Sequence, residues 1–588
     1  MFSPSGEELA SASWDKTIYI RSTNDWFTRL VLEGHTNTIT SIDYNHDGTV
    51  LASVAGNNAV WEADNSLIFW DLNSGNKICQ VADHQAGVNK VIFDKGSTRA
   101  FTASTDGTVK YCGYEDCGVV ATFVGINNSE FMIYTPDNYY MASKKALNGI
   151  AFRIGDKLVP FEQFDIYLNR PDIVTKRIGK SSDKIINAYY YLFKKRLKRL
   201  NLEEGNLKLD FNIPKILIET NAELVTSEET QKFWIKAWDD NYNLKQINVY
   251  VNDVPVYGEL GFQITEEVKS YRKEIEVPLI AGVNKIQFSC LNDKGAESFF
   301  ETVEMIREDE GGMNNLFIAA IGVSDYADQS FNLKYPTKDV NDFVTSMRAS
   351  SELYKKIEVK LLLNEEATTE NFKSLDAFFE PCSHEDIAMI FIAGHGVLDE
   401  NFDYYFGTYD MDFNAPKAKG LAYDDIHKLL NKIKSYKKLL IMDTCHSGEL
   451  DKDEIEQGPD PEVEDGNIEF RGVNGVRTKE GFGNENSVGY LQDVFSDTRK
   501  GSGATVIASA GGAEYAMESD DWKNGLFTYC FLSGLRNPKT DLNKNGMVEV
   551  SEIRAYVNNL VAQLSGGKQI PSSREENISQ DYPIFALE

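Results

Sequence analysis

Residues 387–396 of the chain are IAMIFIAGHG, and residues 438–448 are KLLIMDTCHSG. Each segment begins with an apolar run of the length of a buried strand and passes directly into glycine and polar residues. Similar apolar runs alternate with helical patterns nearby: strands are expected at 316–323 and 357–363, and helices at 339–348, 369–379 and 423–432. Strands that are apolar throughout and alternate with helices predict an α/β domain whose mostly parallel sheet is covered on both faces.

Two of these strands carry His395 and Cys445 at their carboxyl ends, where catalytic groups gather in sheets of this kind. A free thiol has a pKa of about 8.5 and is mostly protonated at neutral pH, yet only the thiolate is a good nucleophile. An imidazole within reach can take the proton and later return one to a leaving amine. The pair therefore predicts a nucleophile and its general base, with His446 and His384 as other candidate bases. The structural alternative is a small buried cysteine and a histidine that only packs.

The segments His395-Gly396 and Asp443-Thr444-Cys445-His446-Ser447-Gly448 resemble the active-site motifs of metacaspases and bacterial caspase-like peptidases. A histidine about 50 residues before the cysteine belongs to the caspase signature. The resemblance covers residues 313–588, within a peptidase domain expected at 311–588, and includes 508–512 and 524–528, which resemble a later strand and helix of the family. It implies a cysteine endopeptidase whose oxyanion hole is formed by the backbone N–H groups of Gly396 and Cys445.

The same resemblance implies a preference for Arg or Lys before the scissile bond. Asp443 resembles the metacaspase acid that lines this pocket, Asp339 resembles a second pocket acid, and Asp410 is a third candidate. A carboxylate in a desolvated pocket favours a cationic side chain, because a neutral isostere leaves the carboxylate unpaired. The structural alternative for Asp443 and Asp339 is helix capping.

Residues 447–502 form a long polar stretch that is acidic from 449 to 469 and then rich in glycine and basic residues. Loops of this length in a compact domain are functional or disordered. The caspase-like family has its intersubunit linker here, which implies self-cleavage after a basic residue. A plain disordered insertion is the alternative.

Residues 541–552, DLNKNGMVEVSE, fit the calcium-binding loop of an EF-hand. A glycine stands at position 6 for the sharp turn, and helical patterns flank the loop at 527–535 and 551–564. The expected ligand positions are Asp541, Asn543, Asn545, Met547 (through its backbone carbonyl), Glu549 and Glu552. A solvated Asp/Asn turn that binds no metal is the alternative, since EF-hands usually occur in pairs.

The first ~120 residues repeat with the 40–45-residue period of propeller blades. Residues 13–17 correspond to 104–108, Gly34-His35 opens a second unit that closes at Trp70-Asp71, and His84 opens a third. These features resemble the WD-repeat family. Two or three units cannot close a ring, so we expect further degenerate blades at 118–160, missing upstream sequence, or an incomplete propeller. The WD-repeat region is expected to span residues 1–172 and to serve as a scaffold without chemistry.

Between the two ends of the chain, residues 173–207 are expected to form a helical linker, with an amphipathic helix at 185–202. Residues 208–310 alternate apolar with polar residues between Asn, Asp and Gly turns, which predicts an immunoglobulin-like β-sandwich that acts as a spacer. The fold class is therefore multidomain: a partial all-β propeller, a β-sandwich and a C-terminal α/β caspase-like domain.

The composition restricts the partners. The formal net charge is −30, from 90 acidic and 60 basic residues, which argues against nucleic acid or an anionic membrane and suits basic peptide substrates. The seven cysteines show no paired spacing, so reduced thiols are expected. No signal peptide and no apolar run of about 18 residues is visible, so the expected location is cytoplasmic.

These observations lead to two hypotheses. The first is a cysteine endopeptidase that cleaves proteins after Arg or Lys, with a protein partner bound through the propeller and with calcium as its cofactor. The second is a WD-repeat interaction scaffold whose caspase-like domain is silent or cleaves only itself.

Overall fold

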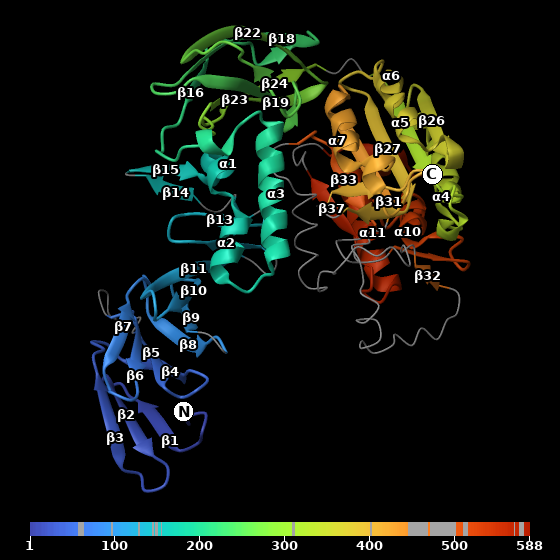
Figure 1. Cartoon of the computed structure of the whole chain (residues 1–588). Coiled ribbons are helices and arrows are strands. Elements are labelled where there is room, and N and C mark those ends of the chain that lie inside the picture. The colour runs from blue at the N-terminus through green and yellow to red at the C-terminus, as the bar shows by residue number, and fades with distance from the viewer. Residues whose placement is uncertain are drawn as a thin grey trace. The chain divides into compact units, whose positions relative to one another are not determined.

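The computed structural model describes residues 1–56, 64–95, 98–126, 130–143, 146–147, 151–154, 156–308, 312–399, 403–444, 468–470, 501–509, 516–569, 571–575 and 581–587 (Figure 1). These residues form two compact units, Met1–Phe193 and Lys194–Glu588. No helix among them is long and apolar enough to cross a bilayer.

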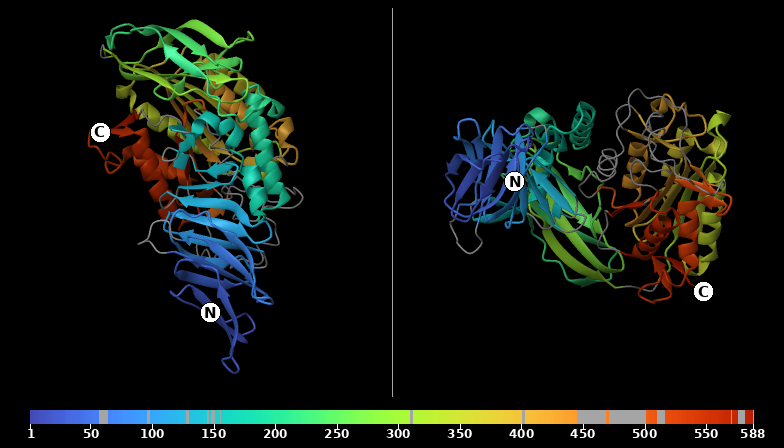
Figure 2. Two further views of the ribbon diagram at one scale, coloured as in Figure 1. Left: turned by 90° about the vertical axis from the view of Figure 1, so that its left-hand side faces the viewer. Right: turned by 90° about the horizontal axis from the view of Figure 1, so that it is seen from below.

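The first unit consists mainly of antiparallel sheets that follow one another along the chain (Figure 2). The first sheet has three strands, β1 (Glu8–Ala12), β2 (Thr17–Ser22) and β3 (Thr28–Glu33), and the second has four, β4 (Ile39–Tyr44), β5 (Val50–Ala55), β6 (Leu67–Asp71) and β7 (Lys77–Val81). The third has six strands: β8 (Val88–Phe93), β9 (Arg99–Ser104), β10 (Thr108–Gly113), β11 (Gly118–Gly125), β12 (Phe131–Tyr134) and β13 (Tyr140–Ala142). Residues 118–142 thus extend the third sheet.

A buried hydrogen-bond network holds the second sheet together. Trp70 Nε1 donates to Ser53 Oγ at 2.7 Å, and the ring of His35 joins that hydroxyl, at 2.8 Å, to the carboxylate of Asp64, at 2.9 Å. The third sheet repeats the pattern, since the His84 ring lies 2.8 Å from both Thr102 Oγ1 and the Asp106 carboxylate. The residues that suggested the WD repeat from sequence therefore tie together the strands of their own sheets.

One pair of cysteines departs from the expectation of reduced thiols. Cys79 on β7 and Cys117, in the turn between β10 and β11, form a disulfide with their Cα atoms 5.7 Å apart. The two residues are 38 positions apart, and only the packing of consecutive sheets brings them together. Sequence spacing therefore gave no signal for this bond.

The first unit ends in a hairpin and helices. They are β14 (Ala151–Ile154), β15 (Lys157–Pro160), α1 (Asp165–Leu168), α2 (Pro171–Ile178) and α3 (Asp183–Arg199), and the last six residues of α3 belong to the second unit. Helix α3 ends three residues before the predicted end, because Asn201 adopts φ +53° and the N–H of Leu202 bonds back to the carbonyl of Leu197 at 2.9 Å. This is a Schellman-type stop.

The next part of the second unit contains two β-sheets with a common apolar core. One sheet comprises β16 (Lys215–Ile218), β18 (Thr230–Trp238) and β22 (Ser270–Pro278). The other comprises β17 (Val225–Thr226), β24 (Glu301–Arg307), β23 (Gly282–Asn292), β19 (Leu244–Val251) and β20 (Val254–Pro255), with β21 (Phe262–Gln263) also on β19. The all-β character agrees with the sequence analysis, and the assignment to the immunoglobulin class stays a prediction.

The main sheet of the second unit has six strands in the order β26 (Ile357–Leu363), β25 (Leu316–Gly322), β27 (Ile387–Gly394), β31 (Lys437–Thr444), β33 (Thr505–Ala508) and β37 (Ser572–Glu575). The first five are parallel, and β37 is antiparallel to β33. The predicted mostly parallel sheet is confirmed.

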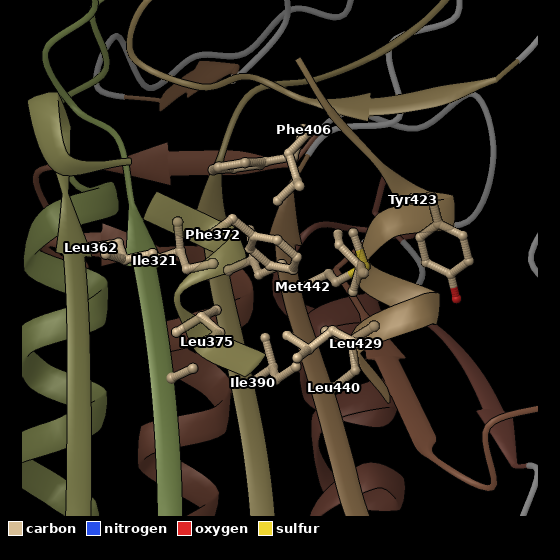
Figure 3. Close-up of a cluster of buried hydrophobic side chains, with 14 of the residues drawn as sticks. Ile321, Leu362, Phe372, Leu375, Ile390, Phe406, Tyr423, Leu429, Leu440 and Met442 are labelled. Carbon is tan, nitrogen blue, oxygen red and sulfur yellow. The ribbon is translucent and has the colours of Figure 1, made fainter. Parts of the chain in front are cut away.

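Helices cover both faces of this sheet. Helices α4 (Pro336–Ala349), α10 (Leu526–Arg536) and α11 (Val550–Leu564) pack on one face, where Phe343 and Phe531 meet Phe391 and Ile441. Helices α5 (Thr369–Lys373), α6 (Leu375–Phe379) and α7 (Tyr423–Lys432) pack on the other (Figure 3).

Three small sheets accompany the main one. The first comprises β28 (Gly396–Leu398), β29 (Tyr404–Phe406) and β30 (Leu421–Ala422). The second comprises β32 (Ile468–Phe470), β34 (Met517–Ser519) and β35 (Asn524–Gly525), and the third comprises β36 (Met547–Glu549) and β38 (Pro583–Ala586).

Candidate active site

The register of two central strands places the strand ends that lead to the two candidate residues at one edge of the sheet. Strands β27 and β31 are parallel neighbours, Ala393 is the partner of Asp443, and Gly394 is the partner of Thr444. Gly394 and Thr444 are the residues directly before His395 and Cys445. Neighbouring strands are about 4.8 Å apart. Cys445 itself, His446 and almost all of the 447–502 stretch lie outside the described residues.

The strand end before His395 requires glycine. Gly394 has φ +150°, and a Cβ atom there would lie 3.0 Å from the Phe406 ring and 3.0 Å from the hydroxyl of Tyr326. Real side chains do not tolerate such approaches to two buried rings without displacing them. The glycine therefore lets the chain turn from β27 into His395 while both rings stay in place.

The His395 side chain is buried and oriented by its neighbours. Its Nε2 lies 2.9 Å from the backbone carbonyl of Phe331, and its backbone N–H donates to the hydroxyl of Tyr326 at 3.0 Å. A carbonyl oxygen only accepts, so this hydrogen bond places the ring proton on Nε2 and leaves Nδ1 as the basic nitrogen. Sequence analysis missed Phe331. The contact is made by its backbone carbonyl, which every residue type has, so no sequence pattern points to it.

Aromatic rings enclose the imidazole. Phe331 and Phe413 stack with their centroids 4.1 Å apart, and the edge of the Phe413 ring meets His395 at 5.5 Å. Tyr326 packs against the same imidazole at 5.2 Å. These contacts restrict the rotation of the ring, so His395 presents one fixed orientation.

Thr444, the last described residue before Cys445, is held from two directions. The hydroxyl of Tyr404 on β29 donates to Thr444 Oγ1 at 2.7 Å, and Ser509 Oγ donates to the Thr444 carbonyl at 2.9 Å. Ser509 is linked in turn to Gln569, whose amide donates to the Ser509 carbonyl at 2.8 Å. All four residues are buried. The carboxyl end of β31 is therefore fixed on both sides by strands and loops far away in sequence.

Two of the three proposed pocket acids meet at the start of helix α10. Asp443 accepts hydrogen bonds through Oδ2 from the hydroxyl of Thr528 at 2.5 Å and from its N–H at 3.3 Å. Asp339 accepts from the side-chain amide of Asn524 at 2.8 Å and from the N–H of Gly525 at 3.1 Å. Both acids are fully buried. The N-terminus of a helix favours negative charge, so α10 stabilises two carboxylates beside the end of β31.

The remaining candidates lie apart from this pair. Asp410 is partly exposed, forms an ion pair with Lys419 at 2.8 Å and accepts a long hydrogen bond from Thr408. His384, the alternative base, precedes the amino end of β27, at the opposite end of that strand from His395. Its ring packs on Tyr436 at 5.1 Å, and burial lowers its pKa.

The described part of the chain holds four free cysteines, and their environments make them poor nucleophiles. Burial raises the pKa of each thiol to about 12: Cys112, Cys290, Cys382 and Cys530. For Cys530, the charge of Asp443 adds to the effect of burial. A thiol of this kind is almost entirely protonated at neutral pH, so these four residues are structural.

The 541–552 segment forms a loop with a sharp turn that is closed by its own hydrogen bonds. Gly546 adopts φ +81°, and its N–H donates to Asp541 at 2.9 Å. Glu552 accepts from the N–H groups of Leu542 and Asn543 at 2.7 and 3.2 Å. Helices α10 and α11 flank the loop as predicted. The short strand of this loop, β36, pairs with β38 near the C-terminus. The strand that completes this small sheet therefore does not come from a second calcium loop.

The ligand arrangement of this loop fits a metal only in part. Among the described residues, no three His, Cys, Asp or Glu side chains converge as a metal centre would require. The side-chain amides of Asn543 and Asn545 donate to Glu549 at 3.0 and 3.1 Å. Burial and the nearby negative charge of Asp581 raise the pKa of Glu549, so this loop concentrates like charges. A calcium ion would require the Asn amide groups to turn their oxygens inward.

Comparisons with known proteins agree with this architecture. Residues 318–582 match the caspase domain family, and residues 1–22, 27–71 and 75–111 match the WD domain, G-beta repeat. Among curated proteins, the chain is 27% identical over 173 residues to Protein hir1 of Schizosaccharomyces pombe, covering 25% of this chain and 18% of that protein. It is 29% identical over 180 residues to Protein HIR1 of Candida albicans, covering 25% and 19%.

The match to these relatives is partial, since the chain spans less than a fifth of their length. Among solved structures, U3-55K and the RRP9 WD40 repeats are each 17% identical to this chain, with a TM-score of 0.20. Each match covers 24% of this chain, and the matches cover 50% of the U3-55K chain and 49% of the RRP9 chain. The two family matches fall on separate parts of the sequence. The chain therefore combines a caspase domain match over residues 318–582 with WD-repeat matches at its N-terminal end.

Proposed function

We propose that this protein is a cysteine endopeptidase in which Cys445 is the nucleophile and His395 is the general base. The observation that carries the proposal is the pairing of Gly394 with Thr444, the residues directly before these two, on neighbouring parallel strands. The hydrogen bond from His395 Nε2 to the Phe331 carbonyl supports it, because it leaves Nδ1 free of a proton. The caspase-domain match over residues 318–582 supports the same reaction class.

In the proposed reaction, His395 Nδ1 takes the proton of the Cys445 thiol, and the thiolate attacks the scissile carbonyl carbon. The backbone N–H groups of Gly396 and Cys445 stabilise the oxyanion of the tetrahedral intermediate. The intermediate collapses as the C–N bond breaks, and the imidazolium gives its proton to the leaving amine. His395 then deprotonates a water molecule, which hydrolyses the thioester and regenerates the thiol.

We propose a preference for Arg or Lys before the scissile bond, with Asp443 and Asp339 as its source. Both carboxylates are held at the start of α10, next to the strand that leads to Cys445. Fixed negative charges in a poorly solvated region attract a cationic side chain strongly. Asp410 is the weaker candidate, because Lys419 already neutralises it.

The test uses the full-length protein with fluorogenic peptides that end in Arg, Lys or Asp, beside the variants Cys445→Ala and His395→Ala. We expect cleavage after Arg or Lys that both substitutions abolish. Cleavage after Asp would overturn the specificity while leaving the dyad intact. Activity that persists in Cys445→Ala would overturn the dyad. Mass spectrometry of the purified protein also tests self-cleavage after a basic residue between 447 and 502.

Calcium is proposed as the cofactor of the 541–552 loop, and protein substrates and a protein partner of the WD repeats are the proposed partners, in the cytoplasm. Asp541 and Glu552 would hold the ion at the two ends of the loop, with Asn543, Asn545, the Met547 carbonyl and Glu549 between them. The ion would fix the loop that connects α10 with α11.

A second function is favoured by the WD repeats. Their similarity to the hir1 proteins supports an interaction scaffold whose caspase-like domain is silent or cleaves only itself. Substrate cleavage in trans separates the two hypotheses. A protein that binds a partner through residues 1–142 but turns over no peptide would favour the scaffold.

A further inference from the structure

The end of helix α3 forms a cluster of ion pairs with the caspase domain. Lys195 Nζ lies 2.7 Å from the carboxylate of Asp403 and 2.9 Å from that of Asp424, and Arg199 lies 2.9 Å from Asp424. All four side chains are less than one-third exposed. Burial alone would raise the pKa of Asp424, but the two cations outweigh it, so its pKa is lowered. We call these four residues the α3 clamp.

The two acids of the clamp adjoin two aromatic residues that pack on each other. Asp403 directly precedes Tyr404 on β29, and Asp424 directly follows Tyr423, the first residue of α7. The two tyrosine rings pack in a T-shaped, edge-to-face arrangement, with their centroids 6.4 Å apart and their planes at 82°. Figure 3 shows Tyr423 at the start of α7, next to the core that α7 shares with the sheet. The clamp therefore holds the backbone on both sides of this ring pair.

One tyrosine of this ring pair also contacts the strand that precedes the proposed nucleophile. The hydroxyl of Tyr404 donates to Thr444 Oγ1 at 2.7 Å. Strand β29 also pairs with β28, in which Gly396 faces Phe406. A shift of Tyr404 would therefore disturb both Thr444, which precedes Cys445, and Gly396, which follows His395.

We propose that Lys195 and Arg199 are positioning residues for the active site, acting through Asp403, Asp424 and the hydrogen bond between Tyr404 and Thr444. This inference rests on the proposed peptidase function and adds control of that site by the helix that joins the two units. Displacement of the end of α3 releases β29 and lets Thr444 move. Because a misplacement of about 1 Å can lower a rate roughly a hundredfold, a small movement is sufficient.

The test compares three variants of the full-length protein. Lys195→Glu with Arg199→Glu breaks the clamp. Lys194→Glu with Lys198→Glu makes the same charge change at two exposed lysines on the same helix. The third adds Asp403→Lys and Asp424→Lys to the first, which inverts every charge of the clamp and restores opposite signs. The readouts are kcat/KM for peptides, the pH profile of Cys445 alkylation by iodoacetamide, and hydrogen exchange of residues 403–406 and 437–444.

We expect the first variant to lose at least tenfold in kcat/KM and in the alkylation rate, and to exchange faster at 403–406. The exposed-lysine control should stay within about twofold of the parent, and the fully inverted variant should recover most of the loss. If kcat/KM and the alkylation rate of the first variant are unchanged, or if they fall equally in the exposed-lysine control, the proposed role of the α3 clamp is overturned. If the parent neither cleaves peptides nor shows a reactive Cys445, the peptidase proposal fails, and hydrogen exchange alone then decides whether the clamp orders Tyr404. If the first variant does not fold, Lys195→Gln with Arg199→Gln replaces it.

Discussion

The hydroxyl of Tyr404 donates a 2.7 Å hydrogen bond to Thr444 Oγ1, and both residues are buried. They lie 40 positions apart in sequence, on β29 and β31. This contact connects the small sheet that follows His395 with the strand that precedes Cys445. The strand ends directly before His395 and Cys445 are therefore joined by the register of the main sheet, and the Tyr404–Thr444 bond ties the small sheet to the second of them.

We predict that Tyr404→Phe destabilises the caspase domain by about 1–3 kcal/mol, because the buried Thr444 hydroxyl loses a partner. The rate of peptide cleavage should fall roughly tenfold or more, since the end of β31 becomes less well fixed. Chemical denaturation and steady-state kinetics measure the two effects. Thr444→Ser keeps the hydroxyl and should behave nearly like the parent, whereas Thr444→Val should resemble Tyr404→Phe. If the stability losses of Tyr404→Phe and Thr444→Val simply add in the double variant, this result would argue against a direct interaction between the two side chains.

A second prediction concerns Thr528, which donates to Asp443 through its hydroxyl and its N–H. Thr528→Val keeps the shape but removes the hydroxyl bond to a buried carboxylate, and should cost about 1.5–3 kcal/mol. We also expect a weaker preference for Arg and Lys, because Asp443 loses its fixed orientation. The measurement is kcat/KM for matched peptides ending in Arg and in Gln. Thr528→Ser keeps the hydroxyl and is the conservative control. An equal preference for Arg over Gln in Thr528→Val and Thr528→Ser would contradict a role of Asp443 in the pocket.

Much of the architecture followed from the sequence, because its signals are local. The apolar runs predicted at 316–323, 387–393 and 438–442 became β25, β27 and β31 with small shifts at their ends. The helix predicted at 369–379 is two short helices, since the Ser374 hydroxyl bonds back to the Asn371 carbonyl at 2.6 Å where they meet. Such a local competition between side chain and backbone is hard to read from a periodic pattern.

The site was predictable only in part. His395 and the strand end before Cys445 were visible because glycine and polar residues follow apolar strands. The partners Phe331, Tyr404 and Thr528 were not, because each acts through a tertiary contact that leaves no spacing in the sequence. The disulfide between Cys79 and Cys117 was missed for the same reason.

The third prediction is a loss of order in the third sheet of the first unit as the pH falls. Burial lowers the pKa of His84, so His84 is neutral in the fold and its contribution is present above pH about 6.5 and lost below it. Burial alone would raise the pKa of Asp106, but hydrogen bonds from Thr108 and His84 lower it to about 2. The contribution of Asp106 is therefore present above pH about 4 and lost as the pH falls towards 2.

Hydrogen exchange of β9 and β10 as a function of pH measures this loss. We expect protection to fall in two steps, one below pH about 6.5 and one between about 4 and 2. Asp106→Asn should remove the lower step, because the amide does not titrate. A parent protein with constant protection from pH 7 to 3, after correction for intrinsic exchange rates, would show that this network does not control the stability of the sheet.

The last prediction tests calcium at the 541–552 loop without relying on activity. A ligand that binds only the folded state at a hundred times its Kd stabilises it by about 2.7 kcal/mol, so millimolar calcium should raise the Tm of the parent. Glu552→Gln should abolish the shift, because the carboxylate at position 12 is the principal ligand of such a loop. Ser551→Ala, at a neighbouring exposed position that is not an expected ligand, should keep it. An equal shift in Glu552→Gln, or no shift in the parent, would mean that the loop is a solvated turn held by its own hydrogen bonds, such as those from Asn543 and Asn545 to Glu549.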